Sequence, residues 1–507
     1  MGQEIEVKLG VEPDFVPPAL DGVAAGIRTE AGPSASLDAT YHDAGDLRLI
    51  RAGITLRHRL GEGGADGTWT LKLPNPVTAP AGALRREETL VAGPAGAVPA
   101  ELATLVRPWL RTATLAPVAR LQTERRTTRL VRDDDDGGDA VVVGEVDDDE
   151  VTVLDGDRVA ARFREIEVEV QPEAVDLLDA AVERLRAAGA GPPDPHPKLV
   201  RALGLQAVAP PDLVVEAVGP SSSAAAVVRA GFGAAVVRVV EHDAVIRADV
   251  DPEGIHQARV GLRRLRSDLR TFAPILDPAW SEPLRTELGW LAGELGAVRD
   301  RDVMAANLRA AIDALGPDAP AAAGLLERLG AEREVAVREA VAALDSDRYL
   351  ALLDRLVDAA RSPRTLPAAD APAADVLPGL AGAAFAKLRK RVKRLGRHPS
   401  ADALHELRIK AKRARYAVDV AVPVVGHRAK ATAKAIGALQ DVLGNHQDCA
   451  VAEAWLRGAL HGASPEQAFA LGRLVADQQR RAEALRAVWR KAWKPLRARK
   501  RTSWLSR

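Results

Sequence analysis

Residues 3–9 read Gln3-Glu4-Ile5-Glu6-Val7-Lys8-Leu9, a strict alternation of polar and apolar side chains. A β-strand has a period of two, so Glu4, Glu6 and Lys8 share one face and the three apolar residues share the other. An ordinary surface strand shows this pattern when its charges face water. A strand whose charged face lines an enclosure for metal ions and an anionic substrate shows it too. The choice between these interpretations depends on whether other strands repeat the pattern.

The alternation recurs between Gly/Pro/Asp turns up to about residue 205, which predicts mainly antiparallel β structure. Basic residues on faces of this type are Lys8, Arg57, Arg59, Lys72, Arg86 and Arg125, with Lys198 after the strands. The acidic ones are Glu4, Glu6, Glu88, Glu145, Asp147, Glu165, Glu167 and Glu169. Several strands with one apolar and one mixed-charge face are best explained by a closed barrel. Helices then cover its apolar outside, and the charges line a lumen.

Such a lumen suits the chemistry of phosphate chains. Arginine gives paired donors to phosphate oxygens, and lysine gives a compact charge. Confined carboxylates stay ionised together only when cations neutralise them, and hard oxygen ligands select Mg²⁺ or Mn²⁺. Paired metals could bridge the phosphates and activate the attacking water. The alternative is a barrel that holds internal salt bridges only.

The ordered motifs of this half resemble the CYTH family of triphosphate tunnel metalloenzymes. They are Glu4-x-Glu6-x-Lys8, Tyr41 to Leu49, Arg51-x-Gly53-x-x-Leu56-Arg57-x-Arg59, Thr70-Leu71-Lys72, Arg86-x-Glu88, Asp147, Glu167-x-Glu169 and Lys198-x-x-Arg201. The resemblance implies an eight-stranded antiparallel tunnel, with divalent metal held by Glu4, Glu6, Asp147, Glu167 and Glu169. It also implies a triphosphate clamp of Lys8, Arg57, Arg59, Lys72, Arg125 and Lys198, to which we add Arg86. We assign the catalytic role to Glu4, Glu6 and Lys8.

A linker is expected at 206–227, where Pro210, Pro211 and a Gly-Pro-Ser cluster occur. Residues 228–507 then show helical periodicity, and we expect an all-α domain. A Pro/Ala-rich break from Ser362 to Pro378 divides this domain into halves at about 228–361 and 379–507. The fold class is therefore α+β multidomain, with a 1–205 barrel followed by two repeated helical bundles.

The helical halves repeat one motif, H-x2-R-x3-[KR]-x2-R, at an offset of 149 residues. Its members are His256, Arg259, Arg263 and Arg266, extended by Arg270, and His405, Arg408, Lys412 and Arg415. On a helix each set forms one stripe. Like charges at these spacings repel, which favours a bound anion over the alternative of a solvated helix face. Aromatic residues are only 3%, so base stacking is not expected and a phosphate chain is the better partner.

The doubled His/Arg helix resembles the CHAD domain, an α-helical domain associated with inorganic polyphosphate. We carry anion binding over to the nine stripe residues only. The charge distribution agrees, since residues 1–220 sum to roughly −14 and residues 221–507 to roughly +14, which is typical of a polyanion-binding half. The basic C-terminal segment, Arg486 to Arg507, is expected to be a frayed, solvated end.

Composition excludes several classes of protein. No apolar run approaches the ~20 residues of a membrane span, and no signal-peptide pattern is present. The single cysteine, Cys449, excludes an internal disulfide. We therefore expect a cytoplasmic protein, with association to polyphosphate granules as one option, and no sequence-specific nucleic acid or membrane as partner.

The expected function is Mg²⁺- or Mn²⁺-dependent hydrolysis of inorganic triphosphate or another triphosphate in the tunnel, with polyphosphate bound by the helical half. One alternative is a non-catalytic polyphosphate-binding or granule-associated protein. The other is a class IV-type adenylyl cyclase, which would use the same tunnel to form cyclic AMP from ATP.

Overall fold

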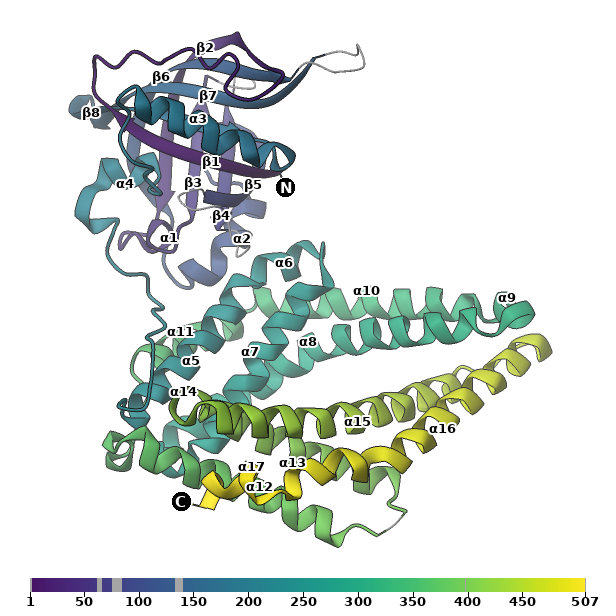
Figure 1. The fold of residues 1–507 in the computed structure, drawn as a ribbon. Helices are drawn as coiled ribbons and strands as arrows, with labels where there is room; N and C mark the ends of the chain where they lie inside the picture. Colours follow the sequence, from purple (N-terminus) through teal and green to yellow (C-terminus); the bar gives the residue numbers. More distant parts are fainter. Residues whose placement is uncertain (1, 62–65, 75–83, 133–139, 397, 507) are drawn as a thin grey trace. The chain divides into compact units, whose positions relative to one another are not determined.

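We describe a computed structural model of the chain, which covers all residues except 1, 62–65, 75–83, 133–139, 397 and 507 (Figure 1). The chain divides into two compact units, Met1–Asp212 and Leu213–Arg507. The second unit's first helix begins at Ala224, inside the linker expected at 206–227. Among the described residues, no helix is both long and apolar enough to cross a membrane.

The first unit is an antiparallel barrel whose strands follow the order β1-β5-β4-β3-β2-β6-β7-β8. The strands are β1 (Gly2–Val11), β2 (Ile27–Asp43), β3 (Thr55–Leu60), β4 (Thr68–Pro74), β5 (Leu84–Ala92), β6 (Ala116–Arg132), β7 (Val141–Asp155) and β8 (Arg158–Val170). Closure occurs at β1, which pairs with β5 on one side and β8 on the other. The expected eight-stranded antiparallel barrel is confirmed for the described part of the chain.

The β1–β5 ladder extends only to Glu6. Beyond it, the segment after α3 (Val175–Ala187) continues the seam: the backbone N–H groups of Gly191 and Asp194 donate to the carbonyls of Gly10 and Lys8, at 2.9 and 2.8 Å. This pairing leads the chain into α4 (Lys198–Leu203). Lys198, far from the strands in sequence order, is thereby brought to the barrel.

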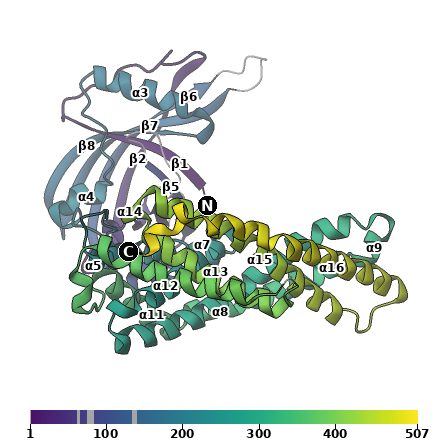
Figure 2. The same ribbon diagram turned by 60° about the horizontal axis from the view of Figure 1, so that its bottom comes forward.

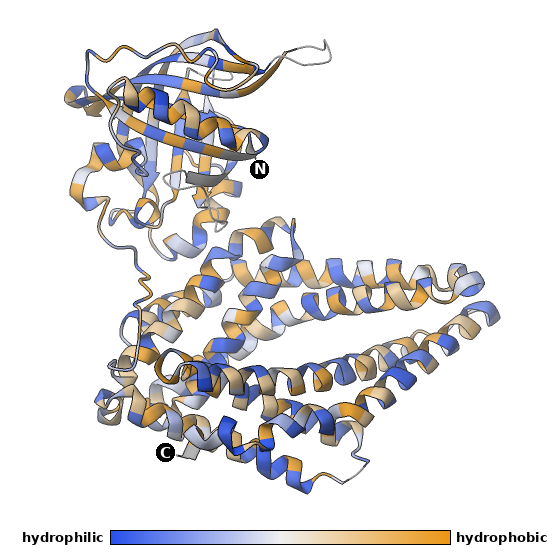
Figure 3. Ribbon diagram, viewed as in Figure 1, coloured by the Kyte–Doolittle hydropathy of each residue, from blue (hydrophilic) through white to orange (hydrophobic). Residues whose placement is uncertain are grey.

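The apolar faces of the strands point outwards, and helix α3 covers one of them. Ile5, Val7 and Leu9 of β1 pack in one cluster with Leu177 and Leu178 of α3. Burying each such side chain contributes about 1.5–3 kcal/mol, so burial of this face fixes which side of each strand faces the lumen. Figure 3 shows the resulting alternation of hydrophilic and hydrophobic residues along the strands.

One end of the barrel is filled with apolar side chains. Tyr41, Leu121 and Val151 form a buried cluster with Ile50, which lies in α1 (Arg48–Arg51), and Leu199 of α4. The fourth flanking helix is α2 (Ala100–Leu110), whose Leu102 and Val106 are buried. The charged layer of the lumen therefore lies above an apolar floor.

The second unit has no β-strand longer than an isolated bridge among its described residues, and its main helices correspond in pairs. Helices α5 (Ala224–Glu241), α7 (Pro252–Thr271), α8 (Pro278–Asp313) and α10 (Gly324–Asp345) match α12 (Ala373–Arg394), α13 (Ala401–Val420), α15 (His427–Gly458) and α16 (Pro465–Trp493). Between the halves lies α11 (Asp347–Arg361), and the short helices are α6 (Asp243–Ala248), α9 (Ala319–Ala322), α14 (Val422–Val425) and α17 (Arg499–Thr502). Two repeated helical bundles are confirmed. Helix α12 begins at Ala373 and contains Pro378, ahead of the expected start of the second half at about residue 379.

The equivalent helices meet at three places. The N-cap residues Ser223 of α5 and Pro372 of α12 form a β-bridge. Helices α7 and α13 contact each other near the middle of the unit (Figures 1 and 2). At the far tips, Leu308 and Leu329 of the first half share an apolar cluster with Leu456 and Leu474 of the second.

The C-terminal segment is docked, and the expectation of a frayed end was wrong for its described part. Trp504 is buried, and its indole nitrogen donates to the hydroxyl of Thr432 at 3.1 Å. Two apolar residues near the end of the chain, Trp504 and Leu505, provide the burial that a purely basic tail would lack.

Candidate functional site

The inward-facing charges of β1, β8 and β7 lie in rows because their ladders are in register. Lys8 lies opposite Glu167, and Glu167 lies opposite Asp147. One step nearer the apolar floor, Glu165 lies opposite Asp149. Period-two alternation puts each strand's charges on one face, and the register then brings the charges of three strands together.

Glu167 is the centre of this cluster. Its carboxylate accepts from the Nζ of Lys198 at 2.7 Å and from the guanidinium of Arg125 at 2.9 Å, and it also pairs with Lys8. Burial alone would raise the pKa of Glu167, but the three cations outweigh burial and hold the pKa well below its ordinary value. Glu167 therefore stays ionised inside the barrel.

Lys198 joins the two rows from the end of α4. Its Nζ lies 2.9 Å from an oxygen of Asp149 and 2.9 Å from one of Glu165. Burial lowers the pKa of the ammonium, but Glu165, Glu167 and Asp149 together raise it well above the ordinary value. Arg125 joins the same carboxylates from the β6 side and donates to Asp149 at 2.8 and 2.6 Å.

Asp147 is the acid of this cluster that is least completely neutralised. Its carboxylate accepts from the hydroxyl of Thr127 at 2.6 Å and pairs with Arg125. Burial nevertheless raises its pKa to about 6, since Arg125 and Thr127 offset burial only in part. An additional cation beside Asp147 would favour its ionised form.

The opposite wall of the lumen is basic. In the closed strand order, β3 and β4 lie across from β8 and β7, so Arg57, Arg59 and Lys72 face the acidic wall. The guanidinium of Arg57 donates to the hydroxyl of Tyr41 at 3.2 Å, and its buried Nε has no partner among the described residues. Lys72 lies 3.6 Å from Glu88. The opposite charges of the two walls complement an anion that carries bound metal cations.

The carboxylates suit a hard divalent cation by their chemistry, since all are oxygen donors of the kind that Mg²⁺ and Mn²⁺ prefer. The described members of the expected metal set are Glu6, Asp147, Glu167 and Glu169. As placed, no three acidic, histidine or cysteine side chains of the described chain form a metal cluster. Lys8, Lys198 and Arg125 lie between the carboxylates and neutralise them.

The remaining expected barrel residues lie apart from this cluster or outside the described side chains. Glu169 is exposed, opposite Glu6 and Glu145 near the other end of the barrel from the apolar floor. Glu4 and Arg86 lie opposite each other in β1 and β5, but their side chains fall outside the described part of the structure.

Several residues that our site assignment left out contact the cluster or its clamp, among them Tyr41, Thr127, Asp149 and Glu165. Asp149 and Glu165 share the alternating faces of Asp147 and Glu167, so the signal for them was present in the sequence. Tyr41 belongs to a quoted motif, but its contact with Arg57 depends on the β2–β3 register, in which the two residues are direct partners.

In the helical unit, the structure brings the two basic stripes together. His256, Arg259, Arg263 and Arg266 lie half-buried along α7, and His405, Arg408, Lys412 and Arg415 lie half-buried along α13; Arg270 is exposed at the end of α7. Burial lowers the pKa of Lys412 to about 8, and the charges of Arg408, Arg263 and Arg259 add to this effect. Cations of both helices therefore lower the pKa of Lys412.

Glycines in the next long helix make room for the stripe arginines. A Cβ at Gly296 of α8 would collide with the guanidinium of Arg259, while one at the equivalent Gly444 of α15 would lie 3.9 Å from the Nε of Arg408. Gly289 and Gly437, seven residues earlier, face Arg266 and Arg415, and a Cβ at either would lie at an ordinary contact distance of 3.5 or 3.6 Å. Of these four glycines, Gly296 is the one at which a side chain would collide with the stripe, a role that the sequence did not predict although the glycines recur one residue short of the repeat offset.

The stripe contains few acidic neighbours. Asp300 of α8 lies 3.5 Å from Arg259. Asp448, its counterpart in α15, lies close enough to Lys412 to favour the charged form of that lysine. The Nδ1 of His405 donates to Gln447 at 2.6 Å, so one ring nitrogen of this histidine has a fixed structural role.

The architecture defines the class of protein as an antiparallel barrel with a charged lumen, joined to a duplicated helical domain with a basic stripe. The CYTH domain model matches residues 2–191 and the CHAD domain model matches residues 230–457. The chain is 34% identical to "Uncharacterized protein MT2285" of Mycobacterium tuberculosis (strain CDC 1551 / Oshkosh), with 97% of each chain covered. The chain belongs to the family of proteins that combine a CYTH domain with a CHAD domain.

Two solved structures resemble parts of the chain. PptA from Streptomyces chartreusis is 26% identical with a TM-score of 0.47, over 54% of this chain and 100% of that one. The CHAD domain from the plant Ricinus communis is 30% identical with a TM-score of 0.45, over 55% of this chain and 95% of that one.

Proposed function

We propose that the barrel hydrolyses inorganic triphosphate with the help of Mg²⁺ or Mn²⁺, and that the helical unit binds polyphosphate along the stripe of α7 and α13. The observation that carries the first part is the division of the lumen into facing acidic and basic walls. CYTH domains are typically metal-dependent and act on triphosphates, which agrees with this division.

Each wall has a separate role in the proposal. Arg57, Arg59 and Lys72 bind the phosphate oxygens, and Arg125, Lys8 and Lys198 neutralise the phosphate charge nearest to the carboxylates. Glu6, Asp147 and Glu167 would hold a divalent ion, whose chemistry when bound is to polarise the phosphate oxygens and lower the pKa of a water. The buried apolar floor limits the entry of bulk water, which strengthens every charge interaction above it.

The test is a turnover panel of tripolyphosphate, thiamine triphosphate and ATP with Mg²⁺ and Mn²⁺. We expect metal-dependent release of phosphate from tripolyphosphate, reduced on the order of 10²-fold or more in Glu6→Gln. Glu150→Gln is the matched control, because Glu150 is exposed and pairs with Arg126. Absence of turnover for every triphosphate with either metal would refute the hydrolase, and cyclic AMP from ATP would indicate the cyclase instead.

A binding-only barrel is the second candidate. It is favoured by the contacts of Glu167, which three cations already neutralise. In that case tripolyphosphate would bind without being hydrolysed, and polyphosphate affinity would depend on the stripe alone.

A further inference from the structure

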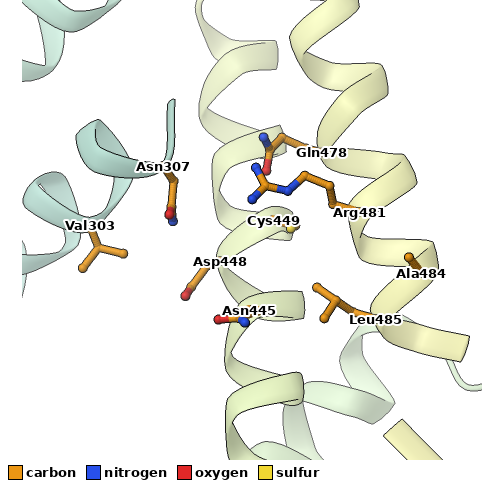
Figure 4. Close-up of a pocket in the computed structure, with 9 residues that line it drawn as sticks. All are labelled: Val303, Asn307, Asn445, Asp448, Cys449, Gln478, Arg481, Ala484 and Leu485. Atoms are coloured by element: carbon orange, nitrogen blue, oxygen red, sulfur yellow. The ribbon is translucent and has the colours of Figure 1, made fainter. Parts of the chain in front are cut away.

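A cavity of about 540 Å³ lies between α8, α15 and α16, and none of the assigned site residues lines it (Figure 4). Its polar wall consists of Asn307, Asn445, Asp448, Gln478 and Arg481, and the thiol of Cys449 also lines it. The rest of the wall is aliphatic. This volume is within the range of sites for small organic ligands, and it is far larger than a single water or ion requires.

Gln478 is the residue that indicates a ligand. Its side chain is only 2% exposed, and its amide nitrogen has no hydrogen-bond partner among the described residues. A buried amide without a hydrogen-bond partner lowers the stability of the folded protein, and a water or ligand that accepts its hydrogen bond would restore this stability. Gln478 lines the cavity, and a molecule inside it is the acceptor that the proposal below assigns to this amide.

The wall's chemistry differs from that of the stripe. One arginine and one aspartate cancel in formal charge, and the three carboxamides of Asn307, Asn445 and Gln478 each offer a donor and an acceptor. A phosphate chain, which is all acceptor, does not match this set. A nucleobase does, because its edge carries donors and acceptors side by side, and carboxamides pair with such edges.

We propose that this cavity binds a nucleotide, with the base among the three carboxamides and the phosphate towards the basic stripe. Asp448, on the cavity wall, is influenced by Arg408 and Lys412 of α13, so the cavity borders the stripe at this point. In this proposal the ribose hydroxyls donate to Asp448 and the phosphate pairs with Arg481, both of which line the cavity. This inference concerns the helical unit and does not depend on catalysis in the barrel.

Cys449 provides a local test, because it is the only cysteine of the chain. The full-length protein is treated with a small methanethiosulfonate, and modification is followed by intact mass with AMP, GMP, CMP or UMP present. We expect at least one of these to slow modification, and tripolyphosphate, which lacks a base, to have no such effect. Monophosphates are used because they lack the triphosphate that the barrel is proposed to bind.

Variants and calorimetry decide the outcome. Gln478→Leu keeps the size but removes the amide, and should weaken the nucleotide about tenfold or more while the protein stays folded. Gln479→Leu is the matched control, since Gln479 is exposed and its amide donates to Glu453. Asn445→Ala, at an exposed position, gives the same test if Gln478→Leu does not fold.

Three outcomes would overturn the proposal. The first is no heat of binding from any of the four nucleotides, and the second is protection by tripolyphosphate equal to that by nucleotide. The third is undiminished affinity in folded Gln478→Leu or Asn445→Ala.

Discussion

Glu167 has a double role in the barrel, because the three cations that hold its charge also depend on it. Lys8, Lys198 and Arg125 each contact its carboxylate. Buried charges of one sign are tolerated only when the opposite charge is present. The side chain that we propose as a metal ligand is therefore also a stabilising element of the metal-free protein.

Glu167→Gln tests this structural role. Removing the central charge leaves three buried cations incompletely neutralised, and we expect the barrel to lose about 3 kcal/mol of its free energy of unfolding. The measurement is urea unfolding in the presence of a chelator, followed by hydrogen exchange of barrel peptides, since the two units need not unfold together. Glu169→Gln, at the exposed position two residues on, should change stability by less than about 0.5 kcal/mol. Equal effects of the two substitutions would contradict the role assigned to Glu167.

Lys412 should make the proposed binding of polyphosphate depend on pH. Its pKa is lowered to about 8 by burial and by Arg408, Arg263 and Arg259, while Asp448 opposes the shift. A bound polyanion favours the charged form of Lys412, so above pH 8 binding is coupled to the uptake of a proton by this lysine. Affinity should thus be flat below the pKa and fall by up to about tenfold per pH unit above it. Lys412→Arg should abolish the fall, because arginine stays protonated.

The measurement is fluorescence anisotropy with labelled long-chain polyphosphate, whose internal phosphates remain ionised throughout this range. The same loss of affinity above pH 8 in Lys412→Arg would show that another group is responsible.

At the scale of elements, alternation predicted the faces of the strands but not their depth along the lumen. Glu165, Glu167 and Glu169 share one face of β8, yet Glu165 is buried and Glu169 is exposed. Depth is set by the ladder register and by the apolar floor, both of which depend on residues far away in the chain. The metal set implied by the resemblance includes Glu169 and leaves out Asp149 and Glu165, and alternation alone does not distinguish these three acids.

The helix pairs show the same limit of prediction from local sequence. The repeat offset predicted that α7 and α13 are equivalent, and the structure confirms their correspondence. The glycines of α8 and α15 recur at a nearly equal offset, but the stripe arginines that they accommodate lie on another helix. Spacing within one helix contains no information about such a contact.

Gly296→Ala tests the contact between elements. The added methyl group would collide with the guanidinium of Arg259, which must move because the helix backbone cannot. We expect the fold to persist and the affinity for polyphosphate to fall by about three- to tenfold, the loss of one charge-assisted contact. Gly444→Ala is the control, since its methyl group would lie at an ordinary distance of 3.9 Å from Arg408. The prediction fails if both variants bind polyphosphate as the native protein does.

At the scale of the molecule, the opposite charges of the two halves have different structural origins. Part of the acidic charge of the first unit is buried in the barrel, where Lys198 and Arg125 neutralise carboxylates such as that of Asp149. The basic charge of the second unit includes a half-buried stripe in which Lys412 lies among arginines of two helices. The charge split therefore predicted a polyanion-binding helical half, but net charge alone could not show that the barrel's acids point inwards.

The two binding modes should consequently respond differently to salt. Polyphosphate on the stripe releases counterions, so its affinity should fall steeply as salt rises, and Arg263→Gln should make the slope shallower by about one. Arg480→Gln, on the exposed side of α16, should leave the slope closer to that of the native protein because Arg480 is outside the stripe.

Tripolyphosphate turnover in the barrel should depend more on divalent ion than on salt, since the charges of the barrel are enclosed and weakly screened. Parallel salt titrations of affinity and turnover in the full-length protein measure both, and identical salt slopes would mean that a single site binds both anions.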